Sequence, residues 1–335
     1  MIFTGNIYYN GRMRKGTLSV GEETNFTDGV ANNGMYGTLI PMPVNAHTHI
    51  GDSFIRDEPR GDLPEIVGPG GFKHRQLENS SDDIIIEGIK NSTSFMEKSG
   101  ILSYFDFREN GIKGAEFINH TDSEYIRPVV LGRPFKNESI QAILDNANGI
   151  GLSSVSDMEY EEAIKSSMLA KKNNKIMALH FSENVREDID MVLNLNPDFL
   201  VHGIEAHESD LQKIKSKNIP IVITPRSNIF FGKRPDYGKF TLAGIELMIG
   251  TDNVFITEPD LFAEMDFLYR YQRFNTYISP SEILRFAIDN PRKFMEKSGM
   301  TYNEKYIFFK NVLLNEYQIV TKKHYFNPIN ITKYE

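Results

Sequence analysis

The chain has 335 residues, of which 40% are apolar, enough for one large domain or two ordinary ones. Acidic residues outnumber basic ones by 45 to 37, and the net charge of −8 argues against nucleic acid as a partner. The absence of cysteine excludes disulfides, thiolate metal sites and a cysteine nucleophile. No apolar run is long enough to span a membrane, and residues 1–9 carry no basic leader region. We therefore expect a soluble, cytoplasmic protein that acts on a small molecule, and we leave open whether it forms a homo-oligomer.

Short β-strands are predicted near both ends of the chain. Residues 2–9 are followed by Asn10-Gly11, a strong hairpin signal, and a polar, glycine-rich stretch then extends to Gly37. Strand-like segments return near the C-terminus at 306–313, 317–321 and 330–334. We expect the two ends to pair into one small sheet beside the main domain.

Between these ends, apolar runs alternate with helix-like segments. The runs predicted as strands are 39–44, 101–107, 126–131, 150–152, 176–180, 199–202, 219–224 and 245–250. Helices are predicted at 81–98, 158–172, 207–217, 258–274 and 280–297. Strands without polar alternation, separated by helices, are typical of a parallel sheet buried on both faces, and eight of them predict a closed (β/α)8 barrel. An open doubly wound sheet is the alternative, but no Gly-x-Gly-x-x-Gly motif follows the first strand.

Histidines and an aspartate stand at the predicted carboxyl ends of the strands, where barrels carry their function. His47 and His49 are two residues apart and can point to the same side of a strand. His180 ends the fifth strand, and Asp252 follows the eighth, which neighbours the first when a barrel closes. Three imidazoles, one carboxylate and an open position for water predict a catalytic divalent-metal site. Imidazole suits zinc, our first choice, and also iron.

Two more residues are candidates for catalysis beside Asp252. Glu183 lies three residues after His180 and is well placed to carry a proton from the attacking water to the substrate. His202 ends the sixth strand and can orient that water. The alternative for any single histidine is a buried imidazole with ordinary partners.

Together these motifs resemble the amidohydrolase superfamily, in the branch that contains cytosine, guanine and S-adenosylhomocysteine deaminases and the triazine chlorohydrolases. The matching segments are Val-Asn-Ala-His-Thr-His at 44–49, Leu-His-Phe-Ser-Glu at 179–183, Leu-Val-His-Gly at 200–203, Pro-Arg-Ser-Asn at 225–228 and Gly-Thr-Asp-Asn at 250–253. The resemblance implies a TIM-type (β/α)8 barrel at residues 38–303. It also implies a small β-sandwich formed by residues 1–37 and 304–335.

The resemblance also implies roles for single residues. His47, His49, His180 and Asp252 would be the metal ligands, with Glu183 as the proton shuttle and His202 orienting the water. Binuclear members carry a bridging lysine near the end of strand four, where this chain reads Gly-Ile-Gly-Leu-Ser-Ser at 149–154. We therefore expect one divalent ion per chain.

Several polar side chains near the predicted rim are candidates for substrate binding. Arginine suits carboxylate and phosphate groups, so these cations predict an anionic substrate, the alternative being salt bridges to nearby acids. The asparagines can bind the edge of a heterocycle, the alternative being turn capping. The candidates are Arg108, Arg133, Arg226, Lys73, Arg75, Asn228 and Asn253.

We expect a metal-dependent hydrolase that deaminates a purine, a pyrimidine or a modified nucleoside, with metal-bound hydroxide as nucleophile and release of ammonia. Removal of chloride or opening of a cyclic amide on the same site is the nearest alternative. A non-catalytic metal-binding scaffold would lack one of the ligands or the acid, and this sequence has all four ligands and the acid.

Overall fold

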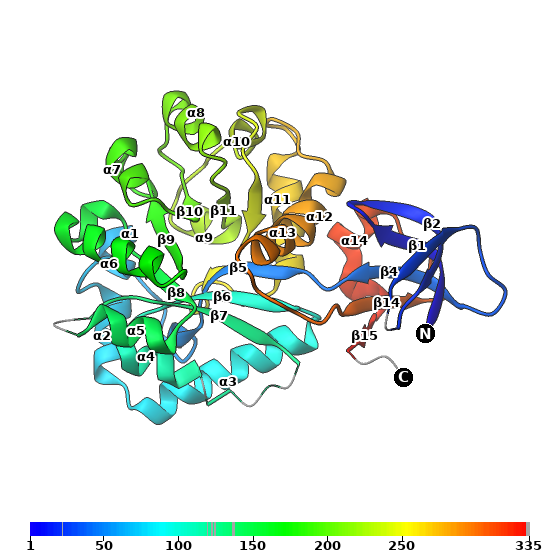
Figure 1. The fold of residues 1–335 in the computed structure, drawn as a ribbon, viewed down its shortest axis with the longest axis horizontal. Helices are drawn as coiled ribbons and strands as arrows, with labels where there is room; N and C mark the ends of the chain where they lie inside the picture. The colour runs from blue at the N-terminus through cyan, green and yellow to red at the C-terminus, as the bar shows by residue number, and fades with distance from the viewer. Residues whose placement is uncertain (22, 119, 122, 124, 136–137, 333–335) are drawn as a thin grey trace.

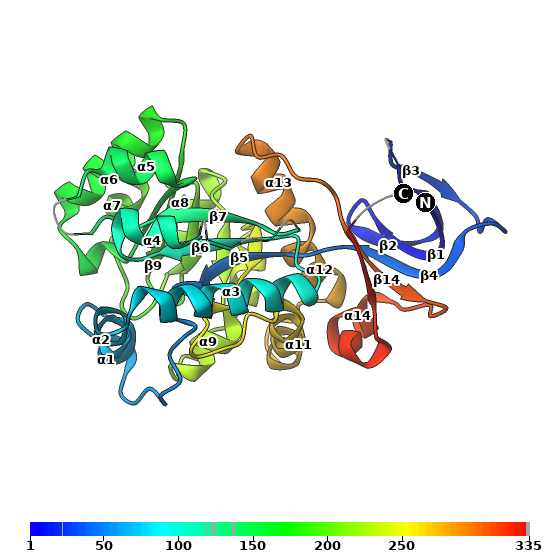
Figure 2. The same ribbon diagram turned by 90° about the horizontal axis from the view of Figure 1, so that it is seen from below.

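The computed structural model of the protein describes residues 1–21, 23–118, 120–121, 123, 125–135 and 138–332. Its α/β architecture has two parts: a parallel sheet surrounded by helices, and a smaller sheet to one side (Figure 1). Figure 2 shows that both ends of the chain lie at the smaller sheet. Within the described ranges, no helix combines the length and apolar character needed to cross a membrane.

The larger sheet has nine strands in the order β12-β11-β10-β9-β8-β7-β6-β5-β13, and its paired strands are parallel. The strands are β5 (Val44–His49), β6 (Ser103–Arg108), β7 (Arg127–Gly132), β8 (Gly149–Leu152), β9 (Ile176–Phe181), β10 (Phe199–His202), β11 (Ile221–Ile223), β12 (Leu247–Ile249) and β13 (Asp252–Asn253).

The two outer strands, β12 and β13, are consecutive in the chain and separated only by Gly250 and Thr251. The Gly250 N–H donates to the carbonyl of Ile223 on β11, and the Thr251 N–H donates to the carbonyl of His47 on β5, both at 3.0 Å. One segment of chain thus bonds to both sides, so the sheet is curled and its two ends meet at this segment.

Helices connect the strands and cover the outside of the sheet (Figure 1). They are α1 (Leu63–Val67), α2 (Phe72–Asn79), α3 (Asp82–Lys98), α4 (Gly111–Ile118), α5 (Ile140–Asn146), α6 (Tyr160–Lys172), α7 (Ile189–Asn194), α8 (Glu208–Ser216), α9 (Pro225–Phe230), α10 (Gly238–Leu242), α11 (Leu261–Gln272), α12 (Pro280–Ala287) and α13 (Asp289–Lys297), with short 3-10 turns η1 (Ile50–Asp52) and η2 (Val155–Asp157). Because the strands are buried on both faces, most of them are rich in apolar residues, and β5 and β6 carry the polar residues of the strand ends.

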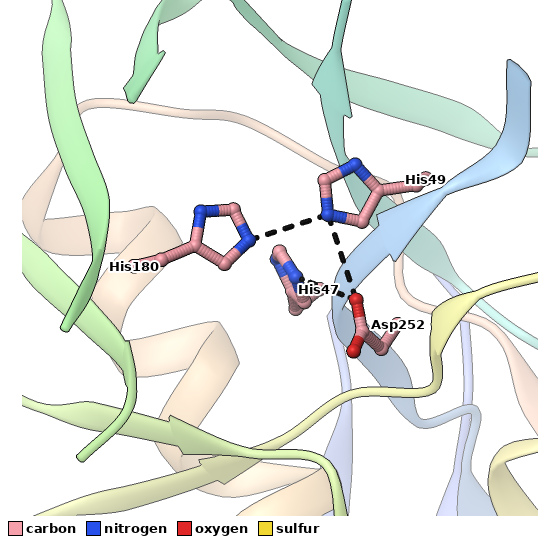
Figure 3. A group of neighbouring side chains, drawn as sticks. All are labelled: His47, His49, His180 and Asp252. Carbon is pink, nitrogen blue, oxygen red and sulfur yellow. Dashed lines mark hydrogen bonds and ion pairs between the residues drawn. The ribbon is translucent and has the colours of Figure 1, made fainter. Parts of the chain in front are cut away.

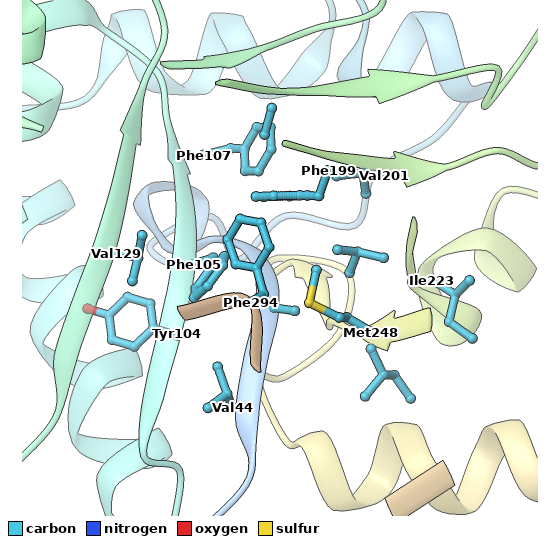
Figure 4. Packing of buried hydrophobic residues seen from close by; sticks show 14 of the residues in the cluster. Val44, Tyr104, Phe105, Phe107, Val129, Phe199, Val201, Ile223, Met248 and Phe294 are labelled. Carbon is cyan, nitrogen blue, oxygen red and sulfur yellow. The ribbon is translucent and has the colours of Figure 1, made fainter. Parts of the chain in front are cut away.

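Aromatic rings form the part of the core that lies nearest the histidines (Figure 4). The ring centroids of Phe199 and Phe294 are 5.3 Å apart, and those of Phe107 and Phe199 are 6.0 Å apart. Phe107 also meets the ring of His47 edge-on, with centroids 4.5 Å apart. The polar strand ends therefore stand on a rigid aromatic layer.

The smaller sheet has six strands in the order β15-β14-β4-β1-β2-β3. They are β1 (Ile2–Tyr9), β2 (Arg12–Ser19), β3 (Asn25–Asp28), β4 (Met35–Pro41), β14 (Tyr306–Lys310) and β15 (Ile329–Ile331), with α14 (Glu316–Lys322) and η3 (Lys323–Phe326) between the last two. Asn10 and Gly11 have φ angles of 52° and 76°, the two positive values that the hairpin turn between β1 and β2 requires. The two ends of the chain thus share one sheet, whereas the β-sandwich stays a prediction.

Two predicted elements are interrupted by proline. The predicted strand at 39–44 is wrong in its bounds, because β4 ends at Pro41 and β5 begins at Val44. Pro41 and Pro43 lack a backbone N–H, so no continuous ladder passes through them. The predicted helix at 280–297 is divided into α12 and α13, because the ring of Pro291 cannot follow the carbonyl of Ala287 in one continuous helix.

The strand predicted at 317–321 is wrong, because these residues form α14. The side chain of Asn315 accepts a hydrogen bond from the Gln318 N–H, and the Gln318 side chain accepts one from the Asn315 N–H. This capping box satisfies two N–H groups that a helix leaves free, and its Asn-x-x-Gln spacing was the overlooked signal. The prediction at 330–334 corresponds to β15 in part, and residues 333–335 lie outside the described ranges.

Replacing Phe199 by alanine should lower the free energy of unfolding by about 3–5 kcal/mol, because the fully buried ring leaves a cavity in the aromatic layer. Urea denaturation followed by circular dichroism measures the change. The matched control is Phe274→Ala, since that ring is 92% exposed and its loss should leave stability nearly unchanged. Equal denaturation midpoints for the two variants would contradict this account of the core.

Candidate active site

Three strands bring four potential metal ligands together (Figure 3). His47 and His49 come from β5, His180 from β9 and Asp252 from β13, and one ligand atom of each lies within 4.8 Å of the others. Asp252 Oδ1 is 3.2 Å from His47 Nε2 and 3.5 Å from His49 Nε2. The Nε2 atoms of His49 and His180 are 3.3 Å apart. The structure thus assembles the ligand set that the sequence predicted.

Outer hydrogen bonds orient two of the imidazole rings. His49 Nδ1 lies 2.8 Å from Glu109 Oε1 and 3.1 Å from the carbonyl of Phe107. His180 Nδ1 lies 2.9 Å from the carbonyl of Leu152. Since a carboxylate and a carbonyl can only accept, we assign the ring proton to Nδ1 in both residues. Each Nε2 then presents a lone pair to the cluster, the tautomer that a metal ligand needs.

The donor set fits a divalent cation. Both ring nitrogens of His47 are buried without a hydrogen-bond partner among the described residues, and a cation would bind the one that carries the lone pair. Burial lowers the pKa of His49 to about 3 and that of His180 well below its usual range, so both rings are neutral, as ligands must be. Three imidazole nitrogens and one carboxylate oxygen suit zinc or another transition metal.

The backbone is bent where the ligands project. Asp252 has a φ of 66° and His202 a φ of 72°, values that residues other than glycine rarely adopt outside functional sites. Gly250 lets the segment between β12 and β13 approach β5, since a Cβ at position 250 would lie 2.7 Å from the Cβ of His47. These features place the Asp252 carboxylate directly beside His47.

Glu183 and His202 form a second pair next to the ligands. Glu183 Oε2 lies 3.5 Å from His202 Nε2, and both residues have a ligand atom within 4.8 Å of one on Asp252. Burial and then the nearby Asp252 carboxylate raise the pKa of Glu183 well above its usual range. A carboxyl group whose pKa is raised holds a proton more readily than an ordinary glutamate and can give and take protons during a reaction.

The partners of His202 define its tautomer. Asn228 Nδ2, which can only donate, lies 3.2 Å from His202 Nδ1, and Thr224 Oγ1 lies at the same distance. The Asn228 carbonyl oxygen in turn accepts a hydrogen bond from the Tyr237 hydroxyl at 3.0 Å. His202 Nδ1 therefore accepts, and we assign the proton to Nε2, which faces Glu183. Asn228 thus orients His202, and it is not among the residues that line the cavity.

A single cavity reaches the ligands and the pair of Glu183 and His202. Its walls combine strand ends with the segment between β5 and α3, which carries α1 and α2. The lining residues are His49, Leu63, Val67, Gly68, Lys73, His74, Glu109, Arg133, Ser153, Ser154, Asp157, His180, Glu183, His202, Asp252 and Asn253.

Arg133 is the cation of this cavity that lacks a partner. Its buried Nε has no hydrogen bond, and its guanidinium forms no ion pair with any part of the chain that the structure describes. Burial also lowers its pKa, although an arginine stays a cation. A half-buried guanidinium that lines a cavity and has no ion pair within the described residues is available to a ligand.

The other predicted arginines lie elsewhere. Arg108 is buried and paired with Asp106 at 3.3 Å and with Glu109 at 2.8 Å. Arg226 is paired with Glu258 at 3.0 Å and with Glu264 at 2.5 Å.

Arg75 is exposed and donates to the Gly70 carbonyl. None of the three lines the cavity, so the structure favours the salt-bridge alternative for Arg108 and Arg226. Lys73 and Asn253 do line it, but their polar atoms bond to each other at 2.9 Å.

Sequence reasoning missed Glu109 and Asp52 as members of the site. Glu109 directly follows the strand-end Arg108, and Asp52 lies three residues after His49. Both positions follow strands that carry other candidates, so a search for acids at strand ends would have found them. Ser153, Ser154 and Asp157, which follow the fourth strand, were also missed as lining residues.

Comparison with known proteins gives consistent matches. A model of the amidohydrolase family matches residues 38–298. An uncharacterized protein of Methanocaldococcus jannaschii is 34% identical over 319 residues, covering 85% of this chain and 82% of its own. A protein of Archaeoglobus fulgidus, provisionally named an aminohydrolase, is 34% identical over 230 residues, or 68% of each chain.

Solved structures with the same fold include enzymes of two chemistries. Helicobacter pylori aminofutalosine deaminase, in complex with methylthio-coformycin, has a TM-score of 0.76 and 16% identity, covering 98% of this chain and 97% of its own. The atrazine chlorohydrolase of Arthrobacter aurescens, complexed with zinc, has a TM-score of 0.72 and 13% identity, covering 92% of this chain and 87% of its own. At such low identity the likeness is one of fold.

Proposed function

The chain belongs to the amidohydrolase family, as a hydrolase of carbon–nitrogen bonds, and we propose that it deaminates an aminated heterocycle in a metal-dependent reaction. One observation carries this proposal: a cluster of three histidines and one aspartate adjoins the pair of Glu183 and His202, and one cavity reaches both groups. The heterocycle would be a purine, a pyrimidine or a modified nucleoside. The carbon–amine bond breaks, a carbon–oxygen bond forms from water, and ammonia leaves.

We also infer that the larger part, residues 38–303, is a TIM-type (β/α)8 barrel. The meeting of both sheet ends at residues 247–253 supports this closure. Residues 1–37 and 304–335 would form the second, smaller domain, with a β-sandwich as its architecture.

His47, His49, His180 and Asp252 would hold one divalent cation, zinc by preference and iron as the alternative. When bound, such an ion lowers the pKa of a coordinated water so that hydroxide is available near neutral pH. Outer partners prepare the ligands: Ser227 donates to Asp252 Oδ2 at 2.6 Å, and Glu109 orients His49. A single ion agrees with the Ser153 and Ser154 side chains at the end of the fourth strand, where no lysine enters the cavity lining.

Glu183 would transfer the protons that deamination requires. Its carboxylate would take a proton from the attacking water and deliver it to the ring nitrogen. It would then take the proton of the newly added hydroxyl group and deliver it to the amine, which leaves as ammonia while the carbonyl forms and the ring nitrogen keeps its proton. His202 Nε2–H would donate to the oxygen on which negative charge develops. Asp252, close to both residues, accepts charge-assisted hydrogen bonds that keep its carboxylate ionised.

Arg133 supports a substrate that carries a carboxylate or phosphate group away from the reacting amine. Of the predicted arginines, it is the one that lines the cavity without a protein partner. Ser153, Ser154 and His74 line the same cavity and can supply further donors to such a group. Free guanine or cytosine, which are neutral, would leave this half-buried guanidinium without an anionic partner.

Hydrolysis of a chloride or of a cyclic amide is the alternative use of this machinery. A chlorohydrolase with the same fold supports this alternative reaction. Chloride leaves without a proton, whereas an amine does not, so the dependence on Glu183 separates the two reactions. A scaffold without catalytic function would have no use for a complete set of ligands beside a protonatable carboxylate.

The purified protein should contain close to one zinc or iron ion per chain by elemental analysis, and a chelator should abolish turnover. His180→Ala and Asp252→Ala should lose both the metal and the activity, because each removes one of four ligands. Two ions per chain would contradict the mononuclear site. Full activity of a metal-free protein would contradict the site as a whole.

Glu183→Gln should retain the metal and the fold but lose about 10²–10⁴-fold in the rate of ammonia release, because the amide cannot shuttle protons. Ammonia release from a panel of aminated heterocycles measures the loss, with Glu208→Gln, an exposed residue on α8, as the control. Turnover near that of the unmodified protein would favour a leaving group that needs no acid.

Arg133→Met should raise KM for an anionic substrate by about ten- to a hundredfold, the equivalent of a charge-assisted hydrogen bond of about 1.5–3 kcal/mol. A neutral analogue should be used equally well by both proteins, and Arg133→Lys should recover part of the affinity. Arg127→Met, exposed at the opposite end of β7, is the matched control. The anionic substrate is excluded if both analogues respond alike to the loss of Arg133.

A further inference from the structure

Building on the proposed metal centre, we propose that Lys73 is a positioning residue that couples the cavity wall formed by α1 and α2 to the metal ligands. Lys73 belongs to α2, within the segment that connects β5 to α3. The same segment contributes Leu63, Val67, Gly68 and His74 to the cavity lining. Lys73 therefore joins the part of the wall that covers the site to the part that binds the ion.

Lys73 is 3% exposed, and its ammonium group has three oxygen neighbours. Its Nζ donates a hydrogen bond to Asn253 Oδ1 at 2.9 Å and forms ion pairs with Glu109 Oε1 at 2.5 Å and with Asp52 Oδ2 at 3.4 Å. These contacts separate Lys73 from Arg133, whose guanidinium forms no ion pair within the described residues.

Two of these partners each hold one of the proposed ligands. Glu109 Oε1, the ion-pair partner of Lys73, accepts a hydrogen bond from His49 Nδ1 at 2.8 Å. Asn253 accepts from Lys73 through Oδ1 and donates through Nδ2 to Asp252 Oδ1 at 3.0 Å. One residue therefore separates the ammonium group from each of two proposed ligands on two different strands.

Charge explains why a lysine is needed at this position. Asp52, Asp106 and Glu109 are buried together, and the cations beside them are Arg108 and Lys73. Removing the Lys73 charge leaves three buried acidic residues beside one guanidinium. Such groups must then rearrange or take up a proton, so Glu109 would no longer hold His49 in the same way.

The third partner ties the lysine to the start of its own segment. Asp52 Oδ1 accepts hydrogen bonds from the Val254 and Phe255 N–H groups at 2.9 and 3.2 Å, just beyond β13. The Phe72 ring, next to Lys73 in the chain, lies 6.1 Å from the Phe255 ring between centroids. Several contacts around Lys73 therefore link the packing position of α2 to the position of the strand end that carries Asp252.

Thermodynamic linkage makes this coupling measurable without turnover. If Lys73 transmits the ligand geometry to α2, metal binding must stabilise the seating of α2, and the seated α2 must slow metal loss. Partners that orient metal ligands typically change metal affinity by about 10–100-fold. Both effects should depend on the same side chain.

The test uses the full-length protein loaded with Co²⁺, which reports its ligand field by visible absorption. Transfer of Co²⁺ to excess EDTA should be about 10–100-fold faster in Lys73→Met than in the unmodified protein, with a shifted cobalt spectrum. Hydrogen–deuterium exchange should show residues 63–79 protected by the metal in the unmodified protein, and this protection should disappear in Lys73→Met. Arg60→Met is the matched control, a cation of the same segment that is 85% exposed and pairs only with Glu58.

Asn253→Ala is a second variant, which removes the hydrogen bonds of Asn253 to Lys73 and to Asp252. It allows the coupling to be tested if Lys73→Met does not fold. It should also speed metal loss and weaken the protection of residues 63–79. Unchanged cobalt transfer, spectrum and exchange in a folded Lys73→Met or Asn253→Ala protein would overturn the coupling while leaving the proposed function intact. An unmodified protein that takes up no Co²⁺, Zn²⁺ or Fe²⁺ would overturn the metal centre and the coupling together.

Discussion

The site depends on polar atoms that converge on one place in the interior. The Nε2 atoms of His49 and His180 and the Oδ1 atom of Asp252 lie close together, as Figure 3 shows, and both ring nitrogens of His47 are buried without a hydrogen-bond partner among the described residues. The two Nε2 lone pairs and the carboxylate do not stabilise one another, whereas a cation would stabilise all three. The fold holds them together because the outer hydrogen bonds and the aromatic layer beneath leave the rings no alternative orientation.

Closure of the larger sheet explains how distant residues reach this place. Asp252 follows His49 by about two hundred positions, yet the chain at Gly250 and Thr251 bonds to β11 on one side and to β5 on the other. The close approach requires glycine at 250, and the turn beyond it requires a positive φ at Asp252. Local strain and the absence of one side chain are therefore the conditions under which a ligand from the last strand can face ligands from the first.

The four residues predicted as ligands do lie together in the structure, because period-two spacing and strand-end positions are local properties. His47 and His49 needed only one strand, and His180 and Asp252 needed only the rule that strand ends gather at one rim. The sequence predicted less well where neighbours decide the outcome. Two prolines divided the predicted strand at 39–44, and the capping box of Asn315 and Gln318 turned a predicted strand into α14. The prolines and the Asn-x-x-Gln spacing were both present in the sequence, but the apolar pattern dominated the prediction.

The predicted cations show the limit of such reasoning most clearly, since pairing is a property of the folded chain. Arg108, Arg133 and Arg226 follow equivalent strands and are indistinguishable by spacing. In the folded chain, two of them neutralise buried carboxylates, and the third lines the cavity without a partner. Lys73 lines the same cavity, yet its three acceptors make it part of the framework. The partners of a buried charge, more than its position at the rim, therefore separate a residue that holds the site from one that is free to hold a ligand.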